Sequence, residues 1–259
     1  MSVFGLYSKY YDLLYAEKDY RNEVTFVSSV LRRAMPNARD LLDLGCGTGR
    51  HAMAFAFDGW RAVGVDQSDG MIARAQQLRG QASPDLGGRL DFHEGDIRSV
   101  RLKAGFDCVI SLFHVMSYQT TDSDLAAAFA TAAAHLRAGG LFLFDFWYGP
   151  AVEKEPPTVR VKHLRDEKVE LTRVAEPVVR PESNVVVVNY QIFLKDRVTS
   201  VISEMREVHT MRYLYLPELA EIGRKYGFEL GQSGAWMSVD RPLATDTWYG
   251  WVMMRMKAD

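Results

Sequence analysis

Cysteine is scarce in this chain, which has two, Cys46 and Cys108, in 259 residues. Neither lies at metal-ligand spacing from a second cysteine or a histidine, which argues against both a disulfide scaffold and a Cys/His zinc site. We therefore expect two free thiols in a reducing compartment and no bound metal.

An excess of charge of one sign is also missing. The chain has 31 Lys and Arg against 33 Asp and Glu, a formal net charge of -2. Such a balance supplies no basic field for nucleic acid or an anionic membrane. No apolar run approaches the roughly 18 residues that suggest a membrane-spanning helix, and no basic stretch followed by an apolar one opens the chain. These absences predict a cytoplasmic protein with neither nucleic acid nor membrane as partner.

What the chain does contain is a glycine-rich turn typical of a ligand site. The apolar residues 41–44 are followed by three glycines in the pattern G-x-G-x-G and by a helix-forming stretch, residues 50–56. Glycine lets the backbone reverse tightly and lets a ligand approach it closely. Arg50 stands where a dinucleotide-binding fingerprint has its last glycine, which argues against a pyrophosphate ligand.

A second apolar stretch, residues 61–66, reads as a strand that ends in Asp66. This carboxylate comes about 20 residues after the glycines, the distance at which an acidic side chain meets a ribose diol. The sequence therefore predicts a ligand that contains a ribose.

Residues 43–49 (DLGCGTG) and 65–68 (VDQS) resemble motifs I and II of class I S-adenosylmethionine (SAM) methyltransferases. The resemblance implies an α/β fold with a Rossmann-like, seven-stranded, mostly parallel sheet, SAM as cofactor and S-adenosylhomocysteine as product. SAM carries a sulfonium and an ammonium but no phosphate, so a carboxylate at Asp43 beside the turn is tolerable.

The resemblance also assigns cofactor contacts. In that family the turn meets the methionine part of SAM, the acid after the second strand holds the ribose, and a following apolar residue, here Met71, covers the adenine. An acid after the third strand, residues 90–94, commonly binds the adenine amino group, although Gly-Asp is also an ordinary turn pair. The expected cofactor-binding residues are Tyr11, Tyr15, Asp43, Gly45, Cys46, Gly47, Gly49, Arg50, Asp66, Gln67, Met71, Asp96, Ile97 and Leu112.

Residues 1–20 are rich in tyrosine. Tyr7, Tyr11 and Tyr15 have the spacing of one helix face, which fits a helix packed on the core. The segment 7–12 (YSKYYD) is also similar to an N-terminal lid of small-molecule SAM methyltransferases, which would close over cofactor and acceptor. We expect Tyr7 and Tyr10 to contact the acceptor.

The buried fourth strand, residues 106–113, should end at the reaction centre by the switch-point rule for open α/β sheets. DNA and protein-amide N-methyltransferases usually carry an Asn-Pro-Pro-Tyr box there, but residues 114–118 read HVMSY, which argues against a nucleobase acceptor. Residues 111–118 and 138–148 are similar to the sugar N,N-dimethyltransferases that finish nucleotide-linked aminosugars such as desosamine.

This second resemblance implies acceptor contacts. In those enzymes the residue matching Tyr118 lies by the acceptor amine, and the aromatic pair matching Trp147 and Tyr148 shapes the pocket. Asp145 is expected to contact the acceptor as well. Those enzymes often carry Glu at this position, so the identity of the acceptor is left open. His114 is interpreted as either a polar contact near the cofactor or a base.

The alternation of strands and helices changes after residue 150. Residues 149–181 contain five prolines, and residues 185–193 and 198–209 read as strands around a turn at 195–197. An antiparallel insertion of three or four strands is predicted, packed on the core or on a second subunit as a homodimer. Where it re-enters the main domain, Glu207, His209 and Arg212 could face the acceptor.

Three segments follow from this pattern: a lid and SAM-binding core over 1–150, the antiparallel cap over 151–210, and completion of the core over 211–259. The strand-helix repeat predicts a parallel sheet. The remaining elements expected are helices at 23–33, 69–78, 126–138 and 217–226, a loop at 80–88, and strands at 141–146, 227–230 and 247–256.

The function predicted is SAM-dependent methyl transfer to N or O of a small polar acceptor, foremost a sugar or nucleotide-linked aminosugar. The catalytic candidates are Tyr118, His114 and His209. Positioning could supply most of the acceleration, and a base would matter more for a hydroxyl than for an amine. Another natural-product or heterocyclic acceptor, a non-catalytic SAM-binding module and, more remotely, a nicotinamide-dependent oxidoreductase are the alternatives.

Overall fold

The computed structural model describes residues 13–14 and 18–258. The four tyrosines predicted to contact cofactor or acceptor from the N-terminal segment lie outside these residues, as does most of the predicted lid. They are Tyr7, Tyr10, Tyr11 and Tyr15.

A seven-stranded sheet forms the centre of the molecule, in the order β10-β11-β5-β4-β1-β2-β3. The pairs among β1 to β5 are parallel, and β11 runs antiparallel to both of its neighbours. This is the predicted class I methyltransferase sheet. Its strands are β1 (Asp40–Leu44), β2 (Arg61–Asp66), β3 (Leu90–Glu94), β4 (Phe106–Ser111), β5 (Leu136–Trp147), β10 (Phe228–Ala235) and β11 (Tyr249–Met256).

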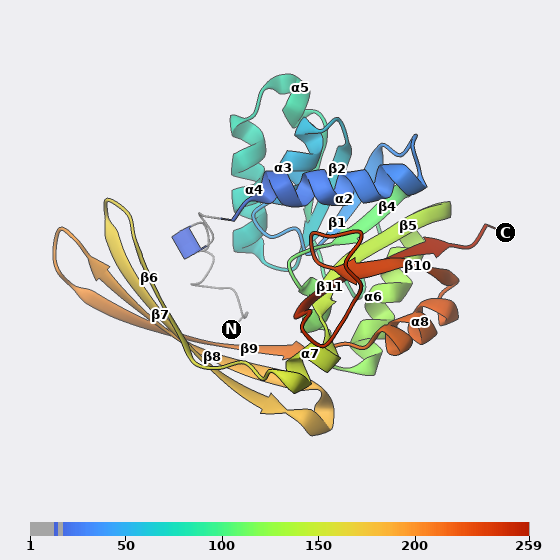
Figure 1. Ribbon diagram of the computed structural model, residues 1–259. Coiled ribbons are helices and arrows are strands. Elements are labelled where there is room, and N and C mark those ends of the chain that lie inside the picture. The colour runs from blue at the N-terminus through green and yellow to red at the C-terminus, as the bar shows by residue number, and fades with distance from the viewer. Residues whose placement is uncertain (1–12, 15–17, 259) are drawn as a thin grey trace.

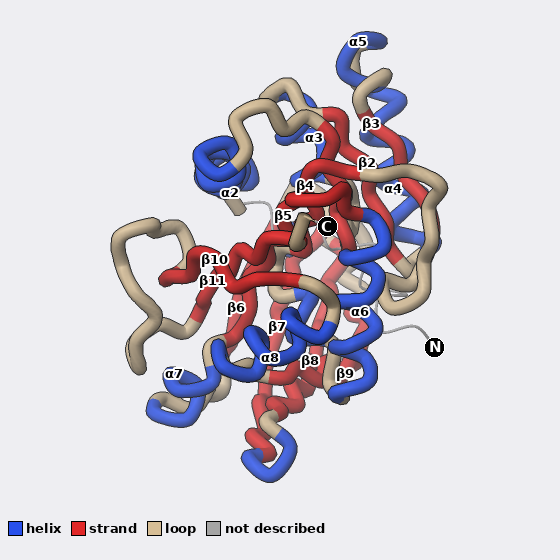
Figure 2. The backbone as a smooth tube through the Cα atoms, turned by 90° about the vertical axis from the view of Figure 1, so that its right-hand side faces the viewer, coloured by secondary structure: helices blue, strands red, loops and turns tan. Residues whose placement is uncertain are grey.

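Helices cover both faces of this sheet (Figures 1 and 2). On one face lie α2 (Tyr20–Ala34), α3 (Arg50–Phe57) and α4 (Asp69–Gln81), and on the other lie α6 (Asp122–His135) and α8 (Leu216–Lys225). The short helices are α5 (Pro84–Gly87), α7 (Gly149–Lys154), η1 (Val115–Tyr118) and η2 (Pro181–Ser183).

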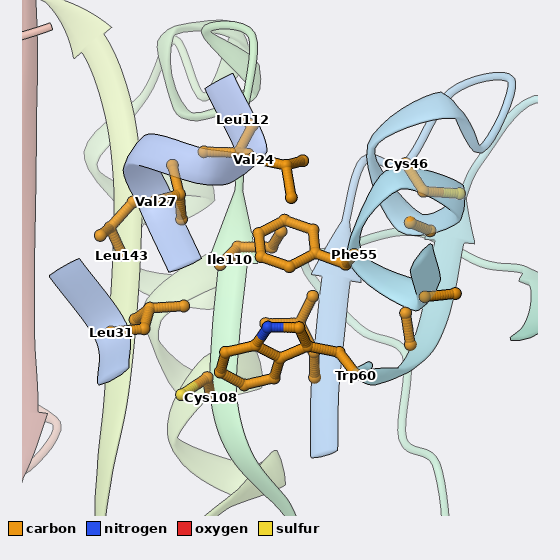
Figure 3. Close-up of a cluster of buried hydrophobic side chains, with 14 of the residues drawn as sticks. Val24, Val27, Leu31, Cys46, Phe55, Trp60, Cys108, Ile110, Leu112 and Leu143 are labelled. Atoms are coloured by element: carbon orange, nitrogen blue, oxygen red, sulfur yellow. The ribbon is translucent and has the colours of Figure 1, made fainter. Parts of the chain in front are cut away.

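The apolar face of α2 supplies part of the core on its side of the sheet (Figure 3). Val27 and Leu31 are fully buried and pack in one cluster with Phe55, Trp60 and Ile110. Full burial of such side chains stabilises a fold by about 1.5–3 kcal/mol each. The polar edge of Trp60 is satisfied as well, because its indole N–H donates to Ser28 Oγ at 3.1 Å.

A separate antiparallel sheet extends away from the main domain (Figure 1). Its strands, in the order β6-β7-β8-β9, are β6 (Arg160–Arg165), β7 (Val169–Arg180), β8 (Val185–Asp196) and β9 (Ile202–Arg212). This sheet is the cap predicted from the sequence. Val186 and Val188 are buried with Val152 and Tyr213, so these valines pack within the chain. The division into segments 1–150, 151–210 and 211–259 stays a prediction.

Several element boundaries differ from the sequence prediction. For example, the strand expected at 227–230 is β10, which extends to Ala235. The expected loop at 80–88 contains α5. Helix α6 begins four residues earlier than expected, because the Thr121 side chain accepts the Asp124 N–H and acidic residues favour the first turn. The predicted end of this helix at residue 138 is also wrong. The helix ends at His135, and β5 begins at Leu136, which pairs with Phe106 across a register shift.

Candidate active site

A cavity of about 510 Å³ lies where the carboxyl ends of β1, β2 and β4 meet the cap. Most residues predicted to bind the cofactor line it, as do all three catalytic candidates. The predicted residues on its wall are Gly45, Cys46, Gly47, Arg50, Asp66, Gln67, Met71, Asp96, Ile97, Leu112, His114, Tyr118, Trp147 and His209.

The glycine turn has the backbone that only glycine adopts readily. Gly45, Gly47 and Gly49 have φ angles of 84°, 54° and 77°, and Gly49 caps α3. A Cβ on Gly45 would lie 2.5 Å from a methyl of Val115, whereas one on Gly47 would meet no atom within 4 Å. The turn is therefore packed closely against η1 at Gly45 and has open space beside Gly47, where a ligand can approach the backbone.

Asp66 joins the turn to the end of β2. Its Oδ2 accepts the N–H of Gly47 and its Oδ1 accepts the N–H of Ser68, both at 2.9 Å. Burial raises the pKa of this carboxyl, and the two backbone bonds partly oppose that rise. Each oxygen has a second lone pair, so the carboxylate can also accept bonds from a ligand diol.

Asp43 lies behind the turn and off the cavity wall. It is 1% exposed, and its Oδ2 has no hydrogen-bond partner among the described residues. Burial, with a smaller contribution from the negative charge of Asp66, raises its pKa to about 7. An unsatisfied buried carboxyl is costly, and a nearby cation would relieve that cost. The site therefore fits a cofactor that carries positive charge and no phosphate.

The side of the cavity predicted to hold adenine is formed by Met71, Asp96 and Ile97. Ser68 caps the helix that carries Met71, because its side chain accepts the Met71 N–H. Asp96 accepts bonds from Arg98, which lowers the pKa of its carboxyl. Arg98 in turn reaches Asp124 at 2.9 Å, so Asp96 is held in an ion-pair network before any ligand binds.

His114 is fixed at the end of β4. It and Phe113 have φ angles of 63° and 68°, a rare backbone for residues other than glycine. The buried carboxylate of Asp145 accepts the His114 backbone N–H at 3.0 Å and lies 2.7 Å from its Nδ1. The His114 ring also stacks on Tyr249 at a centroid distance of 4.7 Å. Asp145 thus lies off the wall and supports a histidine that is on it.

Tyr118 and His209 meet across the cavity although 91 residues separate them. Tyr118 Oη lies 2.7 Å from His209 Nδ1, and His209 Nε2 lies 3.1 Å from Glu207 Oε2. Tyr118 is fixed by η1, where Ser117 Oγ accepts the N–H of Trp147 at 3.2 Å. Two residues predicted as catalytic and one predicted to contact the acceptor thus form one hydrogen-bonded row.

Four residues predicted to bind the acceptor lie away from the cavity wall: Asp145, Tyr148, Glu207 and Arg212. Arg212 bonds to Asp122 at 2.7 Å and to Glu218, and so ties the end of the cap to α6 and α8. Tyr148 packs against the core, and its backbone N–H donates to the Trp248 carbonyl. Gly49, predicted to bind the cofactor, shapes the turn from behind the wall.

The cavity wall also includes residues that no motif indicated. Tyr190 of the cap and Tyr249 of β11 come from segments read only as strands. Tyr20 is the last of the N-terminal tyrosines and was not singled out from the others. Their aromatic character was visible in the sequence, but their shared position was not.

Neither a metal site nor a membrane span is found in the part of the chain that the structure describes. No group of three or more His, Cys, Asp and Glu residues in it could hold a metal ion. No helix in it is both long and apolar enough to cross a membrane.

Comparison with known proteins agrees with this geometry. Residues 41–140 match a family described as a methyltransferase domain. A dTDP-3-amino-3,4,6-trideoxy-alpha-D-glucopyranose N,N-dimethyltransferase of Streptomyces venezuelae is 34% identical over 142 residues, 54% of this chain and 56% of that protein. The match thus spans a little over half of this relative's length.

Two solved structures resemble almost the whole chain. Streptomyces venezuelae DesVI has a TM-score of 0.79 at 24% identity, covering 97% of this chain and 98% of that one. SAM-bound CalS10, an amino pentose methyltransferase of Micromonospora echinaspora, has a TM-score of 0.75 at 25% identity and covers 97% of both chains. The predicted resemblance is confirmed: residues 41–140 match a methyltransferase domain, and the chain has the class I methyltransferase fold.

Proposed function

We propose that this protein transfers a methyl group from SAM to the amino group of a nucleotide-linked sugar. One observation carries the proposal: a single cavity joins the glycine turn and Asp66 to His114, Tyr118 and His209. A cofactor bound at the turn and an acceptor at the cap would therefore share one enclosed space, which is what direct transfer between them requires.

S-adenosylmethionine is the cofactor, and the residues present fit it. Asp66 would hold the ribose hydroxyls, Met71 and Ile97 would border the adenine, and the open space beside Gly47 would take the methionine part. When bound, SAM supplies an electrophilic methyl group. The buried carboxyl of Asp43 suits its positive charge and would oppose a pyrophosphate.

The acceptor end of the cavity suits a polar ring that carries an amine. Aromatic walls from Trp147, Tyr190 and Tyr118 can pack on the faces of a sugar. The carboxylate of Glu207, behind His209, supplies negative charge that favours a cationic or partly protonated amine nearby. The relative from Streptomyces venezuelae is named for a dTDP-linked aminosugar, which supports this acceptor class.

The test is calorimetric titration with S-adenosylhomocysteine, followed by a mass-spectrometric assay with SAM and dTDP-3-amino-3,4,6-trideoxy-alpha-D-glucopyranose. dTDP-glucose, which has no amine, is the matched control acceptor. We expect cofactor-product binding and a mass gain of one or two methyl groups on the aminosugar alone. A protein that does not bind S-adenosylhomocysteine would contradict the cofactor assignment. Binding without methylation of any aminosugar would point to another natural-product or heterocyclic acceptor.

We further propose a homodimer formed through the cap. On the face of the cap sheet opposite to Tyr190 and His209, the side chains of Val161 and Val178 are at least half exposed. Burial of these side chains against a second copy would remove apolar surface from water. Light scattering after size-exclusion chromatography should give twice the chain mass, reduced to one chain by Val178→Lys. A monomer at every concentration would contradict this proposal.

A further inference from the structure

Both ring nitrogens of His209 are within hydrogen-bond distance of protein oxygens. Nδ1 lies 2.7 Å from Tyr118 Oη, and Nε2 lies 3.1 Å from Glu207 Oε2. His209 is 3% exposed, and the Glu207 side chain is 11% exposed. Since neither nitrogen remains for an acceptor molecule, His209 can exchange a proton with the cavity only through the tyrosine.

A tyrosine hydroxyl can donate one hydrogen bond while its oxygen accepts another. Glu207, as a carboxylate, accepts only, so Nε2 of a neutral His209 carries the proton and Nδ1 is the acceptor. Tyr118 then donates to Nδ1, and Tyr118 also lines the cavity, where a phenolic oxygen that donates one bond can still accept another. The two hydrogen bonds of the row therefore point the same way: Tyr118 donates to His209, and His209 donates to Glu207.

We propose that Tyr118, His209 and Glu207 form a relay that removes the proton of the acceptor amine. This inference rests on the proposed function and deepens it. A methylated amine nitrogen carries one proton more than the neutral product. That proton passes to Tyr118 Oη while the Tyr118 hydroxyl proton passes to His209 Nδ1. The product becomes neutral, Tyr118 regains its hydroxyl, and His209 becomes an imidazolium beside the Glu207 carboxylate.

The surroundings of His209 determine how the relay responds to charge. Tyr190 on β8 meets the His209 ring edge-on at 5.0 Å, and Arg173 on β7 lies over the Tyr190 ring at 5.1 Å. Glu207 on β9 thus places a negative charge beside the imidazole. Arg173 brings a positive charge, but the Tyr190 ring lies between it and His209. Tyr118 is the catalytic member, and Glu207 is a positioning residue that acts through His209.

The first test compares Tyr118→Phe, His209→Gln and the double variant, with dTDP-3-amino-3,4,6-trideoxy-alpha-D-glucopyranose as acceptor. Each single variant should lower kcat on the order of 10²-fold or more, the usual contribution of proton transfer, while S-adenosylhomocysteine affinity stays unchanged. The double variant should be no slower than the single ones, because the residues act as a unit. Tyr226→Phe, which removes a hydroxyl at the far end of α8, is the control and should retain wild-type kcat.

The pH profile separates a proton role from a structural one. Neutral His209 is required, so wild-type kcat should fall on the acid side, and this limb should be absent in His209→Gln. Glu207→Gln should lower kcat while S-adenosylhomocysteine affinity stays unchanged, because the His209 ring loses the carboxylate that accepts from its Nε2. Equal losses at every pH in His209→Gln, or additive losses in the double variant, would overturn the relay.

A substrate-free measurement keeps this inference separate from the proposed function. Nitrogen NMR of the histidine rings should show that His209 carries its proton on Nε2, with Nδ1 as an acceptor whose signal shifts in Tyr118→Phe. A neutral His209 protonated on Nδ1 would overturn the relay even if aminosugars are methylated. Conversely, a failure to methylate any aminosugar would overturn the proposed function and leave the NMR result to decide whether the relay exists.

Discussion

The carboxylate of Asp66 accepts the backbone N–H of Gly47 at 2.9 Å and so links the end of β2 to the glycine turn. We propose the same carboxylate as the ligand of the ribose, so that the shape of the turn and the recognition of the cofactor would depend on one side chain. A substitution at Asp66 should therefore weaken cofactor binding while the chain still folds.

Asp66→Ala should weaken binding of S-adenosylhomocysteine by roughly 1.5–3 kcal/mol, the usual value of hydrogen bonds to a charged group. Calorimetric titration measures this change, and circular dichroism checks that the chain still folds. Asp85→Ala, at an exposed carboxylate of α5, is the matched control and should bind normally. Equal affinity of the wild type and Asp66→Ala would contradict the assignment of this residue.

The buried Asp43 should make stability depend on pH when no cofactor is bound. Its pKa is raised to about 7 in the folded protein, against about 4 in an unfolded chain, so the native state binds the proton more tightly. This contribution is complete below about pH 4 and is lost as pH rises to about 7, by up to about 1.4 kcal/mol per unit.

Urea unfolding between pH 5 and pH 8 measures that slope. Asp43→Asn should flatten it, because the amide does not ionise, and should be the more stable protein at pH 8. Asp66, whose pKa is also raised by burial, contributes in the same direction and leaves some slope in the variant. An identical slope in both proteins would show that Asp43 is not held in its protonated form.

Asp145 should act on the reaction through His114. Asp145→Asn keeps the volume of the side chain but removes the charge that faces His114 Nδ1 at 2.7 Å. We expect a lower kcat for Asp145→Asn and His114→Ala, and no further loss when the two are combined. The free energy of unfolding should also fall by about 1–3 kcal/mol in Asp145→Asn, because the half-buried His114 ring loses the carboxylate beside its Nδ1. Independent, additive effects on kcat would contradict this coupling.

Gly45→Ala should destabilise the protein and impair cofactor binding. The backbone there has φ 84°, which costs an L-residue roughly 1–2 kcal/mol, and the new methyl would overlap Val115. Val115→Ala should recover part of the loss by removing the overlap. Gly80→Ala is the control, because no atom lies within 4 Å of the added Cβ and helix α4 favours alanine. Urea unfolding and calorimetric titration measure both effects, and a Gly45→Ala protein of wild-type stability would refute them.

Local patterns were enough to predict much of the fold. β1 and β2 are each a short apolar run followed by a turn and a helix, and such runs with their bounding turns placed β1, β2, β3 and β4 within one or two residues. The misplaced start of β5 has a different origin. Leu136 to Gly140 lack a strand-like run, and they extend because Leu136 pairs with Phe106 on β4.

The sequence by itself was enough to predict the cofactor end of the site, because the glycine turn and Asp66 follow two consecutive strands joined by one helix. Consecutive strands of such a unit usually pair in parallel, which places their carboxyl ends side by side. Only the tertiary structure decided the acceptor end. His114 meets Asp145 because β4 and β5 are neighbours in the sheet. Glu207 and His209 share one face of β9 by strand alternation, but they reach Tyr118 only because the cap folds back over the carboxyl ends of the main sheet. Contacts across 91 residues depend on that chain path, which no local pattern specifies.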